Sequence, residues 1–523
     1  MSVRSHLSGE STLHTRADLC SKKGYDMLYQ KIKARLALSL ITFLIGISIL
    51  VLFCYAVKSG EPDHVWADNT SSANSRGANA DDISIQANGS YTVYLPTVMR
   101  LHDGLWRPVW GTQVSDYSVL DKATQAGIAW LRINARWKNI ETSDNVYDWA
   151  SLDHAITQSV AAGLTPMVGI MVNPAWADAD GTHCGPLKDN QYLTDFVTDL
   201  VKRYKDKVKY WEIGNEVDHM YDESHTQYPD GTIGCWADKV SDYVAFMHTA
   251  YDAVKAADPG AKVMLGGLAM LGYSEIDNTN FLRHFLEAGG GPYFDIAAFH
   301  FGESHETAWY TCADHDRSPG HVCRSAEGLK GKAQIVQNTL SEEGVSGKTI
   351  MLNELGFHCE PCDAAQQEEH ARWVIKAHAR AMSEELPVVI WYTLDYPGFH
   401  GSSLLNSDGS PRPAYNVYPV MASELYMMRY KRTIDGASEF GVADLEGYVF
   451  ELGSVKEKSV MWVNSSTSRL ISYPVASVEG GQLRVVDRYG SARLLTDSTD
   501  DGTHGDGYIS VRVKEPVYVY AYP

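Results

Sequence analysis

Two glutamates, each ending a short apolar run, are the residues of this sequence best suited to acid–base or nucleophilic chemistry. Glu216 follows Asn215 at the end of the run 207–216, and Glu354 ends the run 348–354. A single Glu at the end of a strand is more often a solvated loop residue. Two carboxyls in the same setting predict one site that the fold assembles, in which one acts as a base or nucleophile and the other as an acid.

Eight short apolar runs alternate with amphipathic segments from residue 106 onward, and continuous apolar runs are typical of parallel strands covered on both faces. The predicted strands are 108–113, 130–135, 165–172, 208–215, 262–269, 294–301, 348–354 and 387–394, and the predicted helices are 116–127, 149–163, 190–204, 236–257, 281–288, 325–343, 364–386 and 414–430. Eight strand–helix units predict an α/β fold, the (β/α)8 TIM barrel, with its site at the carboxyl ends of the strands. A doubly wound open sheet is the alternative, but no nucleotide-binding glycine motif follows a strand.

Residues 106–430 resemble the retaining clan-A glycoside hydrolases, nearest their xylosidase/iduronidase-like and cellulase-like branches. The matching motifs are WEIGNE at 211–216, LNELG at 352–356, LRIN at 131–134, WKNIE at 137–141 and VYDW at 146–149. In that family the acid/base Glu follows Asn at the end of strand four, and the nucleophile Glu ends strand seven. The resemblance therefore implies that Glu216 is the acid/base and Glu354 the nucleophile. The family's usual Asn-Glu-Pro reads Asn-Glu-Val here.

The resemblance also implies a double displacement, which needs two carboxyls about 5 to 5.5 Å apart. It places Arg132 beside Glu354, where the guanidinium would keep that carboxylate charged, and gives Asn215 a hydrogen bond to the sugar 2-hydroxyl. The charge of Glu354 and partial burial would raise the pKa of Glu216, which would fall once Glu354 is esterified.

Five further residues are candidates for substrate binding because they lie on predicted strands or shortly after them. Trp391 is predicted as a stacking platform for a sugar ring, with core packing as the alternative. His300 is a candidate contact for the nucleophile or the sugar, with a structural hydrogen bond as the alternative. Asn173 and Trp176 are predicted to line the cleft, and Tyr396 is a weaker candidate. No metal and no other cofactor is expected.

The amino-terminal 57 residues predict a membrane anchor. The run 36–57 has no formal charge and is long enough to span a bilayer, and basic residues within 1–35 place that segment in the cytoplasm. A cleaved signal peptide is the alternative, although its apolar region would be shorter. The polar residues 58–90 are predicted to be a flexible tether, so the catalytic domain is expected outside the cell, either anchored or secreted.

The remaining chain divides into a predicted catalytic barrel at 91–432 and a small antiparallel β-sandwich at 433–523. Strands are expected at 447–453, 458–464, 470–474, 482–487, 507–513 and 517–522. Packing against the barrel is the preferred role of this second domain, and carbohydrate binding is the alternative.

Six cysteines lie beyond the predicted membrane segment, and an even number in an exported region predicts disulfides. Fifteen pairings are open, of which Cys184–Cys235, Cys312–Cys323 and Cys359–Cys362 are preferred. A zinc site at Cys359 and Cys362 is the alternative for the last pair. Glycosylation sequons begin at Asn69, Asn88 and Asn464.

The formal net charge of −20 argues against nucleic acid as a partner, because phosphates need a basic surface. The expected partner is a carbohydrate substrate, cleaved at an O-glycosidic bond that is β by default. One rival is a catalytically silent barrel that only binds glycans. Another is a metal-dependent lyase or hydrolase, which would need His or Asp ligands at several strand ends, where only His300 is visible.

Overall fold

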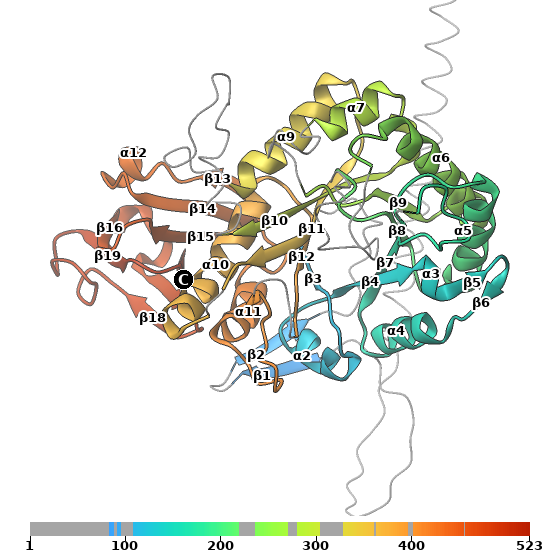
Figure 1. Cartoon of the computed structure of the whole chain (residues 1–523). Coiled ribbons are helices and arrows are strands. Elements are labelled where there is room, and N and C mark those ends of the chain that lie inside the picture. The colour runs from blue at the N-terminus through green and yellow to red at the C-terminus, as the bar shows by residue number, and fades with distance from the viewer. Residues whose placement is uncertain are drawn as a thin grey trace, which may run out of the picture. The chain divides into compact units, whose positions relative to one another are not determined.

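The computed structural model is a closed barrel of eight parallel strands surrounded by helices (Figure 1). It describes residues 83–87, 91–95, 108–181, 183–218, 236–269, 280–303, 328–359, 362–395, 401–453 and 456–522. The barrel strands are β3 (Val109–Thr112), β4 (Trp130–Arg136), β7 (Thr165–Met171), β8 (Tyr210–Ile213), β9 (Lys262–Leu265), β10 (Ile296–Glu303), β11 (Thr349–Phe357) and β12 (Val388–Trp391). They pair in chain order, and β12 closes on β3, so the predicted barrel is confirmed.

Each of the eight predicted helices overlaps a helix of the structure. They are α2 (Leu120–Gln125), α4 (Ala150–Ala161), α5 (Asn190–Tyr204), α6 (Val240–Ala257), α7 (Phe281–Glu287), α9 (Leu329–Glu342), α10 (Ala364–Ser383) and α11 (Pro413–Glu424). The short helix α3 (Trp137–Ile140) and the hairpin of β5 (Glu141–Ser143) and β6 (Val146–Tyr147) were not predicted. The helix predicted at 414–430 ends earlier, because the chain turns at Met427, whose φ is 57°, and enters a strand.

The barrel strands alternate between two faces, as the strand period of two requires. The inward face carries an apolar layer made of Val109, Trp130, Met167, Met264, Ile296, Ala298, Met351, Val388 and Ile390. The residues between them pack outward into the core that the strands share with the helices. Two positions further along several strands, the inward-facing residues are polar, and these residues form the candidate active site.

The carboxy-terminal part forms antiparallel sheets, as predicted. The larger sheet has the order β13 (Arg429–Thr433), β14 (Leu445–Leu452), β15 (Lys456–Val463), β20 (Val517–Ala521), β17 (Leu483–Asp487) and β18 (Ala492–Leu495). The smaller sheet pairs β16 (Arg469–Pro474) with β19 (Tyr508–Val513), and both sheets contribute to one apolar cluster. Strands β13 and β18 were not predicted. Tyr448, Trp462 and Tyr518 of the larger sheet instead join the core that contains the barrel helices.

The amino-terminal predictions fall largely outside the described residues. The predicted span 36–57 and the basic segment before it are among the residues that the structure does not describe. No helix within the described residues is both long and apolar enough to cross a membrane. A hairpin of β1 (Ile83–Ala87) and β2 (Tyr91–Leu95) begins inside the segment predicted to be a tether.

Candidate active site

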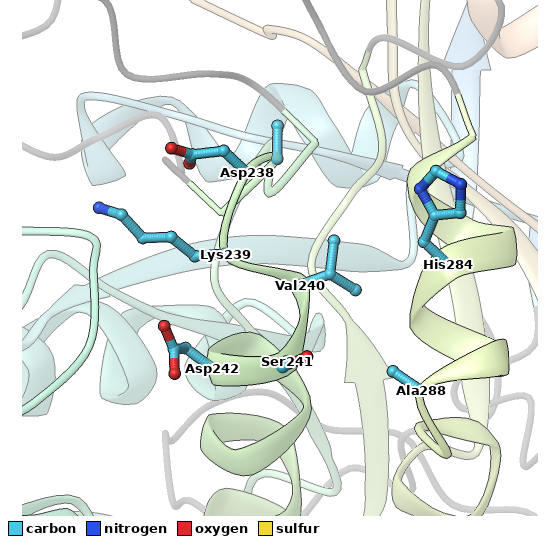
Figure 2. Close-up of a pocket in the computed structure, with 8 residues that line it drawn as sticks. Asp238, Lys239, Val240, Ser241, Asp242, His284 and Ala288 are labelled. Atoms are coloured by element: carbon cyan, nitrogen blue, oxygen red, sulfur yellow. The ribbon is translucent and has the colours of Figure 1, made fainter.

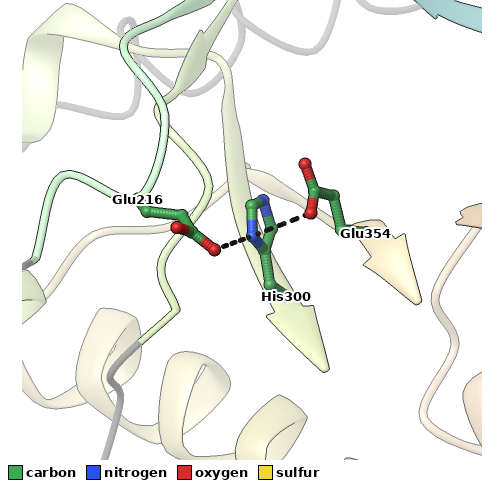
Figure 3. Close-up of side chains that lie close together, drawn as sticks. All are labelled: Glu216, His300 and Glu354. Carbon is green, nitrogen blue, oxygen red and sulfur yellow. Dashed lines mark hydrogen bonds and ion pairs between the residues drawn. The ribbon is translucent and has the colours of Figure 1, made fainter. Parts of the chain in front are cut away.

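Glu216 and Glu354 lie together at the carboxyl ends of the barrel strands, with His300 between them (Figure 3). His300 Nδ1 is 3.1 Å from Glu216 Oε1 and 3.5 Å from Glu354 Oε2. One oxygen of each glutamate and one nitrogen of His300 all lie within 4.8 Å of one another. That spacing fits the separation of about 5 to 5.5 Å in retaining glycosidases and not the 6.5 to 9.5 Å of inverting ones.

A β-bulge in β11 turns Glu354 into the barrel. Phe299 of β10 pairs with Leu352, whereas the next residue, His300, pairs with Glu354, so Asn353 is the extra residue. Leu352 and Leu355 both pack outward into the shared core, which leaves Asn353 and Glu354 on the inward side. Bulges are frequent beside active sites because they re-aim a side chain, and here the bulge adds a second polar residue to the site.

The turn after β8 holds Glu216 in an uncommon backbone conformation. Its φ is 48°, and that of Gly214 two residues earlier is 85°. The left-handed region costs a non-glycine residue about 1 to 2 kcal/mol. Such conformations cluster at functional sites, where surrounding contacts enforce them.

A buried ion network fixes the orientation of Glu354. Arg132 from β4 donates to Glu354 through one terminal nitrogen, and to Glu212 at 2.7 and 3.0 Å. Its other terminal nitrogen also donates to Asn215 Oδ1 at 2.6 Å. Burial opposes the charge of the guanidinium, but Glu212 and Glu354 outweigh it and raise the pKa of Arg132 above its usual range. The predicted contact of Arg132 with Glu354 is therefore present, and Arg132 stays cationic.

Four polar residues of the site were not predicted. Gln113 donates to Glu354 Oε1 at 3.2 Å, and Asn353 donates to Glu212 Oε1 at 2.6 Å. Lys332 from α9 donates to the carbonyl oxygens of Ala269 and His300 at 2.6 and 3.0 Å. Glu212 and Gln113 occupy inward positions of their strands, so the period of two was the signal that could have found them.

A family model described as cellulase (glycosyl hydrolase family 5) matches residues 85–393, more than half of the chain. The chain belongs to glycosyl hydrolase family 5. The resemblance to clan A is thereby confirmed, and the family's activity makes the protein a glycoside hydrolase. No protein of curated function matches the chain.

Solved structures similar to this family 5 chain show the same fold at low identity. A family 39 glycoside hydrolase from the gut symbiont Bacteroides cellulosilyticus WH2 has a TM-score of 0.63 and 19% identity, over 83% of this chain and 84% of its own. A glucosidase from Croceicoccus marinus has a TM-score of 0.51 and 13% identity, over 79% and 95%. The catalytic domain of a family 30 xylanase C from Talaromyces cellulolyticus has a TM-score of 0.51 and 12% identity, over 80% and 98%.

The structure contradicts the stacking role predicted for Trp391 in this family 5 barrel. Its side chain is fully buried, its indole N–H donates to Ser402 O at 2.9 Å, and its ring stacks on His370 of α10. Ile390 faces the barrel interior, so the next residue must face the helices. The core-packing alternative is the one observed. The half-buried Tyr392 is the next residue on the inward side of this strand.

The side chains of Asn173 and Trp176 donate to backbone carbonyl oxygens, Asn173 within its own loop and Trp176 to β5. Asn173 Nδ2 donates to Gly185 O at 2.9 Å, and Trp176 Nε1 donates to Glu141 O at 3.2 Å. Their predicted part in substrate binding stays a prediction, and Tyr396 lies outside the described residues.

One of the preferred disulfides is present just beyond β11 of this family 5 chain. Cys359 and Cys362 are bonded, so neither can serve as the zinc ligand of the alternative prediction. Cys184 is also disulfide-bonded, and its partner lies outside the described residues.

A cavity of about 470 Å³ opens between α6 and α7 (Figure 2). Residues 237–242, His284 and Ala288 line it, and none of the predicted site residues that the structure describes is among them.

Proposed function

We propose that this enzyme hydrolyses O-glycosidic bonds of an oligosaccharide or polysaccharide with retention of anomeric configuration. The observation that carries the proposal is the close approach of Glu216 and Glu354, whose nearest oxygens lie within 4.8 Å of each other and of His300. Membership of family 5 supports the hydrolysis of glycosides, and the β configuration is the default for enzymes of this clan.

In the first step, a Glu354 oxygen attacks the anomeric carbon while Glu216 donates its proton to the leaving glycosidic oxygen. The carbon–oxygen bond to the leaving group breaks, and an ester to Glu354 forms. In the second step, Glu216, now ionised, takes a proton from water, whose oxygen attacks the anomeric carbon. The ester bond breaks, Glu354 leaves as a carboxylate, and the second inversion restores the original configuration.

The neighbouring residues fit these roles. Arg132 and Gln113 both donate to Glu354, which favours the ionised form needed for attack. Asn215 Oδ1 accepts from Arg132, so Nδ2 is the atom that would donate to the sugar 2-hydroxyl. A hydrogen bond to that hydroxyl accelerates the reaction to the extent that it is stronger in the transition state than in the bound substrate.

Chromogenic aryl glycosides test the proposal with two variants. Glu354→Gln should abolish turnover on every substrate, because no nucleophile remains. Glu216→Ala should lose about 10² to 10⁴-fold on poor leaving groups and little on good ones, which need no proton. The exposed Glu287→Gln on α7 is the matched control and should behave as wild type. Equal loss on all leaving groups in the Glu216 variant would contradict the acid role.

Two rivals are separated by the same substrates. A glycan-binding barrel without activity would show no turnover with any glycoside. A metal-dependent enzyme would need ligands such as Glu216, His300 and Glu354, of which one oxygen or nitrogen atom each lies within 4.8 Å of the others. Activity that survives a chelator, together with an NMR time course in which the first product anomer matches the substrate, would support the double displacement.

We also propose that the catalytic domain acts outside the cell, on a membrane anchor formed by residues 36–57. Support comes from the uncharged sequence of that run and the basic residues before it. Protease treatment of intact cells should remove the catalytic domain from the cell surface. A domain that protease reaches only after the cells are broken would count against this location.

A further inference from the structure

Two carboxyl oxygens lie beside Nδ1 of the His300 ring. Nδ1 lies 3.1 Å from Glu216 Oε1 and 3.5 Å from Glu354 Oε2. The residue is only 5% exposed. Two carboxyl oxygens beside one ring nitrogen favour an N–H at Nδ1, because only an N–H can donate to them.

The other side of the ring faces Asn353 across Gly267. His300 Nε2 and Asn353 Oδ1 are both buried, and neither has a hydrogen-bond partner among the described residues. A β-carbon on residue 267 would stand 2.1 Å from Nε2 and 2.9 Å from Oδ1, so both atoms border the same small space. The amide of Asn353 cannot turn its nitrogen toward the ring, because that nitrogen donates to Glu212 Oε1 at 2.6 Å. Oδ1 is therefore the atom of this amide that borders the space beside Nε2.

We propose that His300 is held as an imidazolium cation, with its Nδ1–H toward the catalytic carboxyls and its Nε2–H toward Asn353 Oδ1. Asn353 is then a positioning residue for the reaction, which acts through His300. A neutral ring would place a nitrogen lone pair either beside the two carboxyl oxygens or in the buried space that Asn353 Oδ1 borders, and buried polar atoms without a partner are costly. The effect of His300 on catalysis rests on the proposed double displacement, whereas its protonation state does not.

The charged groups around the ring support this protonation state. Glu354 from β11 and Glu216 after β8 favour the cation, whereas Arg132 from β4 opposes it. Arg132 is already paired with Glu212, and Lys332 from α9 donates to the backbone carbonyl of His300 and not to its ring. Burial lowers the pKa of His300, but the two glutamates outweigh burial and Arg132, and the pKa is raised above its usual value of 6.5.

The cation has two consequences for catalysis. It adds a second positive charge beside Glu354 and so favours the ionised nucleophile. Its Nδ1–H engages Glu216 Oε1, which leaves Oε2 to carry the proton for the leaving group. Loss of the His300 proton should therefore lower activity at alkaline pH, and the alkaline limb of the kcat/KM profile should follow the titration of His300.

Nitrogen NMR of ¹⁵N-histidine-labelled enzyme tests the protonation state without relying on turnover. The His300 signals, assigned by their loss in His300→Asn, should show both ring nitrogens protonated at pH 7 and the change to a neutral ring at a pH above 6.5. A singly protonated His300 ring at pH 7 would overturn the inference. Because this result does not depend on activity, it is distinct from a failure of the proposed hydrolysis.

Two variants test the positioning role of Asn353. Asn353→Leu removes the acceptor, so the His300 titration and the alkaline limb of kcat/KM should move together to lower pH. A purely structural role would lower activity and leave both where they are. Gly267→Ala should reduce kcat at least about 100-fold, because its β-carbon would occupy the space of Nε2. Gly302→Ala on β10 is the control, since its β-carbon meets no atom of the described residues within 4 Å, and it should keep full activity.

Discussion

At the scale of single residues, Arg132 is the side chain on which the site depends most. It is buried, and it binds Glu212, Asn215 and Glu354 at once. Arg132→Met should destabilise the fold by about 3 to 5 kcal/mol, because Glu212 is left as a buried unpaired charge. Urea unfolding measures this loss. The matched control is Arg203→Met, which breaks a half-exposed pair with Asp153 and should cost at most about 1 kcal/mol.

Arg132→Lys separates charge from geometry at the same position. The variant should fold, since it keeps a cation opposite Glu212. A lysine ammonium lacks the planar fork that reaches three partners, so kcat should fall about 100-fold or more. An activity near that of wild type would show that the charge alone suffices, and that the orientation of Glu354 does not depend on the guanidinium.

At the scale of elements, helix α10 makes the fold sensitive to acid. Burial lowers the pKa of His370 to about 3, with a contribution from Arg412, and burial lowers that of His378 to about 4. The unfolded chain takes up these protons below about pH 6.5, whereas the folded chain does not until the pH is far lower. Stability should therefore be lost as the pH falls from 6.5 toward 4, by about 1.4 kcal/mol per histidine at pH 5.5.

Urea unfolding at pH 7.5 and pH 5.5 measures this effect. His370→Phe should lose less stability between the two pH values than wild type, because one proton uptake is removed. The ring of His370 stacks between Phe357 and Trp391, so an aromatic replacement suits the position. The exposed His284→Phe should leave the difference unchanged. His300 acts in the opposite direction, since its raised pKa favours the folded state at low pH. If His370→Phe lost as much stability between the two pH values as wild type, the assignment of the acid sensitivity to α10 would be refuted.

The elements also show what sequence could and could not predict. Eight apolar runs sufficed for the barrel, because parallel strands covered on both faces are apolar throughout. Because every position of such a run is apolar, the sequence does not show which residues face the barrel interior and which face the helices. Trp391 was therefore predicted to face the substrate, whereas it faces the helices. The bulge at Asn353 depends on pairing with β10, which no local pattern reveals, although it brings Asn353 into the site. Glu216, Glu354 and Arg132 were predictable because they stand in motifs of a known family, the two glutamates at strand ends and Arg132 within strand two.

At the scale of the whole molecule, the barrel and the larger carboxy-terminal sheet share one core. Arg380 of α10 lies between Trp373 and Trp462, with its guanidinium carbon 5.3 and 5.5 Å from their rings. It also pairs with Glu446 of β14 at 2.8 Å. Trp462 is fully buried, on a sheet strand rather than in the barrel. The two parts should consequently unfold in one transition, since neither keeps its apolar surface covered without the other.

Trp462→Ala tests this coupling, although the residue lies in the sheet and the active site in the barrel. The variant should lose about 3 to 5 kcal/mol, and the loss of activity and the loss of tryptophan fluorescence signal should keep a common midpoint in denaturant. Leu494→Ala on β18 is the control, because Leu494 is 46% exposed and its truncation should cost little. If activity survived past the unfolding of the sheet, the barrel would be stable alone, and the carboxy-terminal sheets would need a role other than support.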